Sequence, residues 1–141
     1  MHFLYVNLLA VLACGIAAMI LGFLWYSPIL FAKPWVKEMG YDMNDAAKMA
    51  EMKKKAGPAY GVSFLASMVT AFVLGLILNA LTINSPLYGM KLGFAVWLGF
   101  VATVQFTGVL FQGNSMKLFA INTGYQLACY LAMGAILSVW K

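Results

Sequence analysis

The sequence predicts an all-α fold: a polytopic membrane protein, one integral membrane domain over 1–141, built as a bundle of four transmembrane helices. The first observation is composition, because 64% of the 141 residues are hydrophobic and only 9% are charged. The second is that all four acids and six of the nine lysines fall between positions 33 and 55. The third is the set of long uncharged runs that remain, over 1–32, 56–90, 92–116 and 118–140. Each run is long enough to supply the about 20 apolar residues that a helix needs to cross a bilayer, and the runs lack the alternation of barrel strands.

The first transmembrane helix is predicted over 3–26, and an aromatic segment, LWYSPILFAKPW at 24–35, follows its end. Pro28 cannot donate a backbone hydrogen bond, so the helix kinks or stops there. Ser27 is then the expected N-cap of a short interfacial helix. Aromatic rings anchor at membrane interfaces, and Lys33 reaches toward headgroups. The candidate interfacial motif comprises Trp25, Tyr26, Ser27, Pro28, Phe31, Lys33 and Trp35. A membrane exit is the favoured interpretation, and a ligand site is the alternative.

An interfacial and cytoplasmic loop is predicted over 27–57, between helices 1 and 2. Gly40 ends its interfacial part. The stretch 42–56 contains strong helix formers, begins with an acid and ends with lysines, and places Glu51 and Lys55 in the favourable i,i+4 order. We expect a solvated cytoplasmic helix, with an amphipathic helix lying on the membrane as the alternative.

The three remaining transmembrane helices are predicted over 58–83, 90–111 and 117–140. Pro58 suits the first turn of the second helix, because a proline costs no hydrogen bond there. The NSP sequence at 84–86 predicts the next turn. In the following turn, Asn114 or Ser115 is the expected N-cap of the fourth helix.

The distribution of lysines predicts the orientation. The loop after helix 1 and the turn before helix 4 lie on one side and carry seven lysines, against Lys91 and Lys141 on the other. Because positive charge is enriched on the cytoplasmic side, both termini are predicted outside the cytoplasm. The lysines are mixed with acids and the chain has no arginine, so membrane lipids are the expected partners and nucleic acid is not.

Small residues recur at every fourth position of each predicted transmembrane helix. The four ladders are Ala10, Cys14, Ala18 and Gly22; Ser63, Ser67, Ala71 and Gly75; Ala95, Gly99, Thr103 and Thr107; and Ala120, Gly124, Ala128 and Ala132. In lipid, close approach along such residues supplies the packing energy between helices. The ladders predict a compact bundle and suggest a homo-oligomer.

The sequence offers no set of groups suited to catalysis, so no catalytic residue, metal site or cofactor is expected. The only histidine, His2, is terminal. Cys14 and Cys129 fall near the middle of predicted helices and are expected to be packing residues, because two thiols cannot complete a zinc site. Ionisable side chains within a bilayer are usually functional, and these predicted helices have none apart from the lysine at the start of each of the last two.

Uncharged polar residues in the third and fourth helices form a candidate polar cavity. Gln105 lies in the middle of helix 3, where an unpaired amide in lipid costs several kcal/mol, so it should face the bundle. Asn122 and Gln126 lie one turn apart on helix 4, with Tyr125 or Tyr130 beside them. Hydrogen bonds between helices are the favoured interpretation. A cavity open to the cytoplasm and lined by these residues is the alternative.

Several stretches resemble one family of small bacterial membrane proteins. They are LGFLWYSPILFAKPW at 21–35, WLGF at 97–100 and KLFAINTGYQLACYLAMGAIL at 117–137. This resemblance, to domain of unknown function 1761, covers nearly the whole chain. It differs at the turn before helix 4, where Gln112 and Gly113 stand in place of an acid expected there. The resemblance implies a polytopic four-helix bacterial membrane protein and brings no established activity. We expect the chain to lie in the bacterial inner membrane.

The favoured function is a non-enzymatic helical bundle that acts as an accessory or binding component. The alternative is a small oligomeric channel or transporter for a weakly polar solute. A membrane enzyme of the small glutathione-dependent type is less favoured, because such enzymes bind their thiol cofactor with basic residues and this chain lacks arginine.

Overall fold

A computed structural model of the chain describes residues 5–27, 29–38, 45–113 and 115–141. The regular elements within those ranges are all helical, which confirms the all-α prediction. In chain order they are α1 (Leu8–Trp25), α2 (Ala32–Glu38), α3 (Ala46–Ala80), α4 (Pro86–Trp97), the π-helical turn η2 (Leu98–Ala102), α5 (Thr103–Gln112) and α6 (Met116–Val139). The predictions for His2, Pro28, Gly40, Asn114 and the first residues of 42–56 concern positions outside the described residues.

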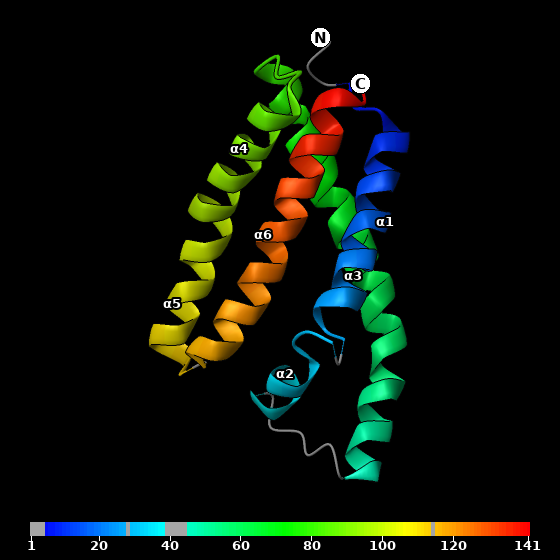
Figure 1. Cartoon of the computed structure of the whole chain (residues 1–141), viewed down its shortest axis with the longest axis vertical. Helices are drawn as coiled ribbons and strands as arrows, with labels where there is room; N and C mark the ends of the chain where they lie inside the picture. Colours follow the sequence, from blue (N-terminus) through cyan, green and yellow to red (C-terminus); the bar gives the residue numbers. More distant parts are fainter. Residues whose placement is uncertain (1–4, 28, 39–44, 114) are drawn as a thin grey trace.

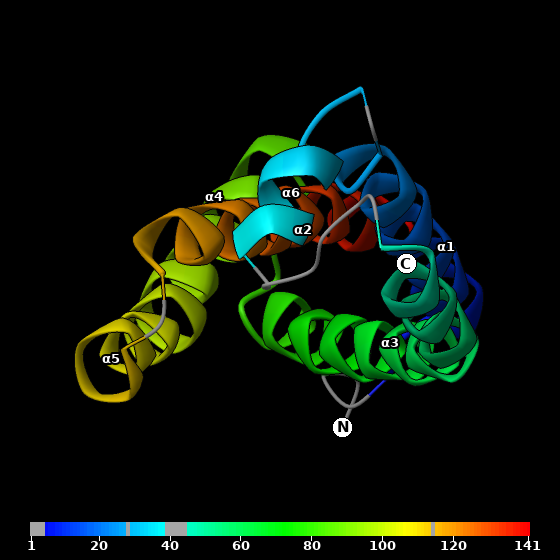
Figure 2. The same cartoon turned by 90° about the horizontal axis from the view of Figure 1, so that it is seen from below.

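Helix α6 is the central element of the bundle (Figure 1). It contacts α1, α2, α3, α4 and α5, and its most extensive contact is with α4. The view from below shows α4 and α5 on one side of α6 and α1 on the other, with α3 beside α1 (Figure 2). Both termini lie at one end of the molecule, whereas α2 and the start of α3 lie at the other (Figure 1).

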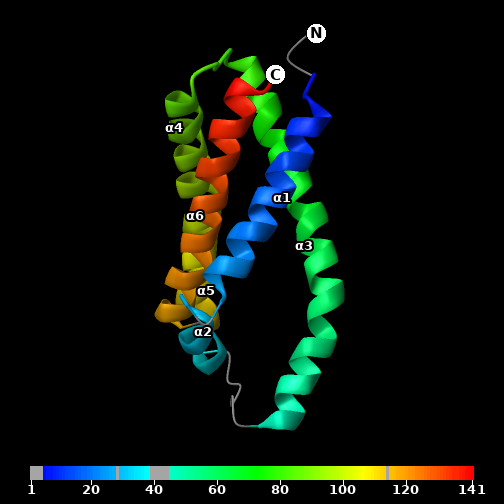
Figure 3. The ribbon, with the colours of Figure 1, turned by 45° about the vertical axis from the view of Figure 1, so that its right-hand side comes forward.

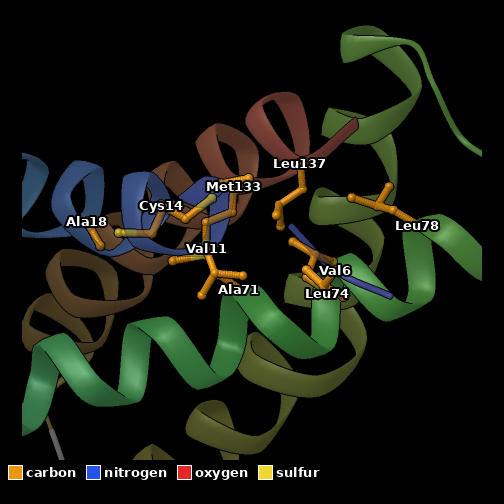
Figure 4. Packing of buried hydrophobic residues seen from close by; sticks show 11 residues of the cluster. Val6, Val11, Cys14, Ala18, Ala71, Leu74, Leu78, Met133 and Leu137 are labelled. Carbon is orange, nitrogen blue, oxygen red and sulfur yellow. The ribbon is translucent and has the colours of Figure 1, made fainter. Parts of the chain in front are cut away.

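The core is formed where α1, α3 and α6 meet (Figure 4). Three members of the predicted ladder of helix 1, Ala10, Cys14 and Ala18, are buried there. Leu74 and Leu78 from α3 are fully buried in the same cluster. Both cysteines, at positions 14 and 129, are free and buried. Small residues on α1 therefore allow the close approach on which the core depends.

Helix α4 approaches α6 through glycines rather than through the predicted ladder. A Cβ atom added to Gly89 would overlap the carbonyl group of Gly134, and one added to Gly134 would overlap that of Gly89. Gly93 meets the backbone of Tyr130 in the same way. The predicted ladder through Gly99 lies on an exposed face, and a Cβ at that glycine would meet nothing within 4 Å. The packing register of this segment was therefore predicted wrongly.

Helix α3 differs from the prediction, because it is continuous where a separate loop helix and a new start at Pro58 were expected. Asp45 caps it by accepting a hydrogen bond from the Lys48 amide, and Glu51 forms the expected ion pair with Lys55 at 3.2 Å. Pro58 lies inside the helix, at a stretch whose neighbours are exposed. Water can hydrate the carbonyl that the proline leaves unpaired, so the helix continues. Its first turns extend beyond the bundle (Figure 3).

Three helical segments are long and apolar enough to cross a membrane: α1, α3, and the continuous helix Pro86–Gln112 that combines α4, η2 and α5. Helix α6 has 24 residues but is not among the three. The polar stretch 122–126 lowers its mean hydropathy. The structure therefore bears out a helical, apolar protein with three possible spans.

Thr82, which follows the end of α3, has a left-handed backbone with φ of 52°. The Ile83 amide donates to the Leu78 carbonyl and the Thr82 amide to the Asn79 carbonyl, so threonine occupies the place that glycine usually takes in this helix terminus. A β-branched residue is strained in this conformation.

Replacing Thr82 with glycine is expected to raise the free energy of unfolding by about 1 kcal/mol, because the left-handed strain is removed. Thermal unfolding in detergent, followed by circular dichroism, measures the change. Gly113, which has φ of 70° at the end of α5, provides the converse control. Its replacement by alanine should lower stability by a similar amount, and a destabilised Thr82→Gly protein would contradict the prediction.

Candidate functional site

The aromatic segment after α1 folds back against α6. The Trp25 indole N–H donates a hydrogen bond of 2.9 Å to the Ile121 carbonyl. The indole also lies against Gly124, where an added Cβ would come within 3.1 Å of the Trp25 ring. The absence of a side chain at that glycine therefore gives the indole its place on α6.

Tyr26 extends this contact to a second side chain of α6. Its hydroxyl donates a hydrogen bond of 2.6 Å to the Asn122 Oδ1 atom. Its ring makes edge-to-face contacts with Trp35 of α2 and Tyr125 of α6, at centroid separations of 5.6 and 5.5 Å. Such contacts add about 0.5–1.5 kcal/mol each beyond the area they bury. Tyr26 thus joins α1, α2 and α6 at one point.

Phe31 and Ser27 shape the turn between α1 and α2. The Phe31 amide donates to the Trp25 carbonyl, and the two rings lie 5.1 Å apart. Ser27 was predicted to cap the interfacial helix, and this is wrong. Its hydroxyl donates to the Leu24 carbonyl at the end of α1, and α2 begins only at Ala32. The serine therefore closes the preceding helix.

We call this cluster the aromatic clasp. It consists of Trp25, Tyr26, Phe31 and Trp35 together with Ile121, Asn122 and Tyr125 of α6. Lys33 also belongs to the predicted interfacial motif, but its side chain is exposed and is not part of the clasp. Two residues predicted for the polar cavity, Asn122 and Tyr125, are thus part of the same cluster as the interfacial motif.

The polar side chains of the predicted cavity all have partners within the bundle. Gln105 donates a hydrogen bond of 2.8 Å to the Gln126 side chain, which joins α5 to α6. The Tyr125 hydroxyl donates to the Ala18 carbonyl of α1 at 2.8 Å. On the α4 side, the Trp97 indole donates to the Thr123 carbonyl at 2.9 Å. This arrangement matches the interpretation as hydrogen bonds between helices. Tyr130 lies apart, in a shallow apolar pocket between α3, α4 and α6.

Replacing Gln105 with leucine is expected to cost about 1–3 kcal/mol of stability, because the Gln126 amide then loses its partner in an apolar environment. The double variant Gln105→Leu with Gln126→Leu should recover most of this loss, since both polar groups are gone. Thermal unfolding of the wild type, both single variants and the double variant gives the coupling energy. If the stability loss of the double variant equals the sum of the losses of the two single variants, the two side chains do not act as a pair.

A pocket with polar and apolar lining that the sequence did not predict lies at the opposite end of the molecule. Its volume is about 290 Å³, and its polar lining includes Asn79, Thr82, Asn84 and Lys141. Asn79 donates to the Tyr5 carbonyl through its amide and accepts a 2.6 Å hydrogen bond from the Lys141 ammonium. Partial burial lowers the pKa of Lys141. The only sequence signal was polar residues near the ends of separate apolar runs, which does not predict that they converge.

Among the described residues, no group of three or more histidine, cysteine, aspartate or glutamate side chains is arranged to hold a metal ion. The sequence profile of the family described as "Protein of unknown function (DUF1761)" matches residues 9–138. Neither the curated proteins nor the solved structures gave a match.

Proposed function

The chain belongs to DUF1761, a family of proteins of unknown function, and we propose that it is a four-span protein of the bacterial inner membrane that acts as a non-enzymatic accessory or binding component. The observation that carries this proposal is the Tyr26–Asn122 hydrogen bond. Tyr26 and Asn122 are among the residues most suited to a ligand site. Because they bond to each other, they stabilise the bundle instead of facing a substrate.

The position of α6 supports the fourth span. It is packed against α1, α3, α4 and α5, which include all three segments able to cross a bilayer. A helix among membrane-spanning neighbours can carry polar side chains when those side chains have partners. Asn122 and Gln126 both have such partners, so their cost within the bilayer is offset.

The exposed first turns of α3 are the part best placed to act as a binding element. Lys48, Lys53, Lys54 and Lys55 lie there, all exposed and beyond the bundle. Under the proposed orientation they face the cytoplasm, where each lysine close to an anionic membrane surface contributes about 1 kcal/mol of attraction. We call these exposed first turns of α3 the arm of α3. Its lysines can bind either lipid headgroups or an acidic segment of another protein.

The orientation is tested by reporter fusions whose activity depends on the compartment. A reporter fused after Lys141 should be active outside the cytoplasm, and one inserted next to Lys55 should be active inside. Lys141 and Lys55 reporters on the same side would contradict the four-span topology, because that topology places three crossings between these two points.

An oligomeric channel for a weakly polar solute is the second candidate, favoured by one observation. The ladder through Gly99 and Thr103 faces away from the bundle, and each of its residues is exposed. Small residues on a lipid-facing helix allow a second copy to approach closely. This face therefore supports the proposal of a homo-oligomer.

A flux assay separates the two candidates. The chain is reconstituted in vesicles, and entry of glycerol or urea is followed by light scattering. The accessory proposal expects the rate of empty vesicles. The channel proposal expects flux above that rate. Gly99→Leu should abolish this flux, whereas Phe111→Leu, at a separate exposed position, should leave it intact. That result would replace the accessory role with the channel. Mass measurement in nanodiscs determines the oligomeric state of the same samples.

A further inference from the structure

The pocket at the end of the bundle that holds both termini is built from four separate segments. Tyr5 precedes α1, Asn79 lies in the last turn of α3, Thr82 and Asn84 lie in the following turn, and Lys141 follows α6. Figure 1 shows these segments meeting at the end opposite α2. We call this pocket the terminal pocket. It is separate from the aromatic clasp.

Asn79 organises the polar side of the terminal pocket. Its amide group donates to the Tyr5 carbonyl, which fixes the direction of its Oδ1 atom toward Lys141. The lysine ammonium has three N–H groups and uses one of them in this 2.6 Å hydrogen bond. Two donors therefore remain on a positive charge that is held in place.

Among the residues that the structure describes, no acidic side chain forms an ion pair with this charge. Of the acids, Glu38, Asp45 and Glu51 lie toward the other end of the molecule. The only ion pair among the described residues is the one between Lys55 and Glu51. The Lys141 side chain remains exposed and can be reached by a ligand, and an anion that enters the pocket would stabilise its charged form.

The terminal pocket also has an apolar wall, formed by Val6, Gly75, Leu137 and Trp140. Asn7 lines it too, but its side chain caps α1 by accepting a hydrogen bond from the Leu9 amide. Tryptophan commonly lies at the level of the lipid headgroups. The terminal pocket therefore combines a fixed cation with an apolar wall near the expected membrane surface.

Thr82 adds a second, independent observation. It keeps a side chain at φ of 52°, where glycine would be free of strain, and it lies in the pocket lining. Strained residues gather at functional sites, because the strain persists only where the side chain or the backbone geometry is needed.

We propose that the terminal pocket binds an amphiphile with a small oxyanion head, a carboxylate or a phosphate, whose head is held by Lys141 and Asn84 and whose apolar stem lies along Leu137. This inference goes beyond the proposed function. It concerns a different end of the bundle, and it does not depend on the clasp or on the arm of α3. The oxyanion has two possible sources, a free carboxylic acid and the headgroup of an anionic phospholipid.

The test uses the full chain in a neutral detergent, with octanoate as the probe in isothermal titration calorimetry and octanol as the uncharged control. The wild type should bind octanoate saturably and should not bind octanol in the same way. Lys141→Gln should weaken octanoate binding by roughly tenfold or more, because a hydrogen bond to a charged group is lost. Lys91→Gln is the matched control, since Lys91 is exposed and lies outside the pocket. It should change the affinity by less than about twofold.

A second arm distinguishes the two sources. Native mass spectrometry compares the lipid retained from mixed nanodiscs of phosphatidylglycerol and phosphatidylcholine. If the chain retains phosphatidylglycerol preferentially, Lys141→Gln abolishes this preference, and octanoate does not bind, then the ligand is the phospholipid headgroup. Octanoate binding that depends on Lys141 assigns the free carboxylate. Asn84→Ala, an exposed position, provides a second variant if Lys141→Gln fails to fold. The inference is overturned if neither ligand binds saturably, or if Lys141→Gln and Lys91→Gln have equal effects. The flux and topology experiments are unaffected by that result.

Discussion

Replacing Gly89 with alanine is expected to lower the free energy of unfolding by about 3 kcal/mol, the upper part of the range for overpacked sites. The added methyl group would overlap the carbonyl group of Gly134 on α6. Backbone atoms cannot move aside as a flexible side chain can, so α4 and α6 must separate along their whole contact. Thermal or denaturant unfolding in detergent, followed by circular dichroism, measures the loss.

Gly99 provides the matched control in the same continuous helical segment. A methyl group there meets nothing within 4 Å. Gly99→Ala should therefore leave stability unchanged or raise it by up to about 1 kcal/mol, through the better helix propensity of alanine. Equal losses in the two variants would mean that the glycine contact between α4 and α6 does not limit stability.

Replacing Trp25 with alanine is expected to cost about 3 kcal/mol, because a large aromatic side chain between α1 and α6 is removed. The variant loses the hydrogen bond to the Ile121 carbonyl, the contact with Phe31 and the packing on Gly124. The same unfolding measurement applies. We expect the segment that contains α2 to become more susceptible to proteases, because Phe31, which directly precedes α2, then loses its contact with the Trp25 ring.

Two further variants separate the contributions of Trp25. Trp25→Phe keeps an aromatic ring and removes the N–H donor, so it should cost about 1 kcal/mol. Phe111→Ala removes an aromatic side chain that is 86% exposed, and it should have little effect on stability in detergent. A Trp25→Ala protein as stable as Phe111→Ala would exclude a structural role for the clasp.

The features that depend on local sequence could be predicted. Ser115 caps α6 by accepting a hydrogen bond from the Leu118 amide, as its place before an apolar run indicated. The Glu51–Lys55 ion pair follows from spacing on a helix. Gln105 faces a partner on α6, as the cost of an unpaired amide in lipid requires.

Features that depend on tertiary packing could not be predicted in the same way. A proline after glycine is a common start of a helix, and nothing in the local sequence shows that Pro58 would lie where hydration permits the helix to continue. The glycine contact of α4 was missed because every helix carries small residues at spacing four. Only the partner helix determines which set is used, and here it is Gly89 and Gly93.

The clasp illustrates the same limit at the candidate site. Its residues were identified as two separate groups, the interfacial motif and the polar cavity. Tyr26 and Asn122 are 96 positions apart in the chain, and no periodicity connects them. The aromatic density of the exit segment is explained once α6 is in place, because each of its aromatic rings has a partner on α6 or within the segment itself.

The central position of α6 has a consequence for biosynthesis. The ribosome produces this helix after the five elements that it contacts, so the earlier helices are synthesised before their main partner exists. Until then α4 lacks its most extensive contact, and the Trp25 and Trp97 indoles lack their acceptors on α6. A chain that stops before Met116 would leave both indole donors without these acceptors. We therefore expect such a truncated chain to be degraded faster than the intact one.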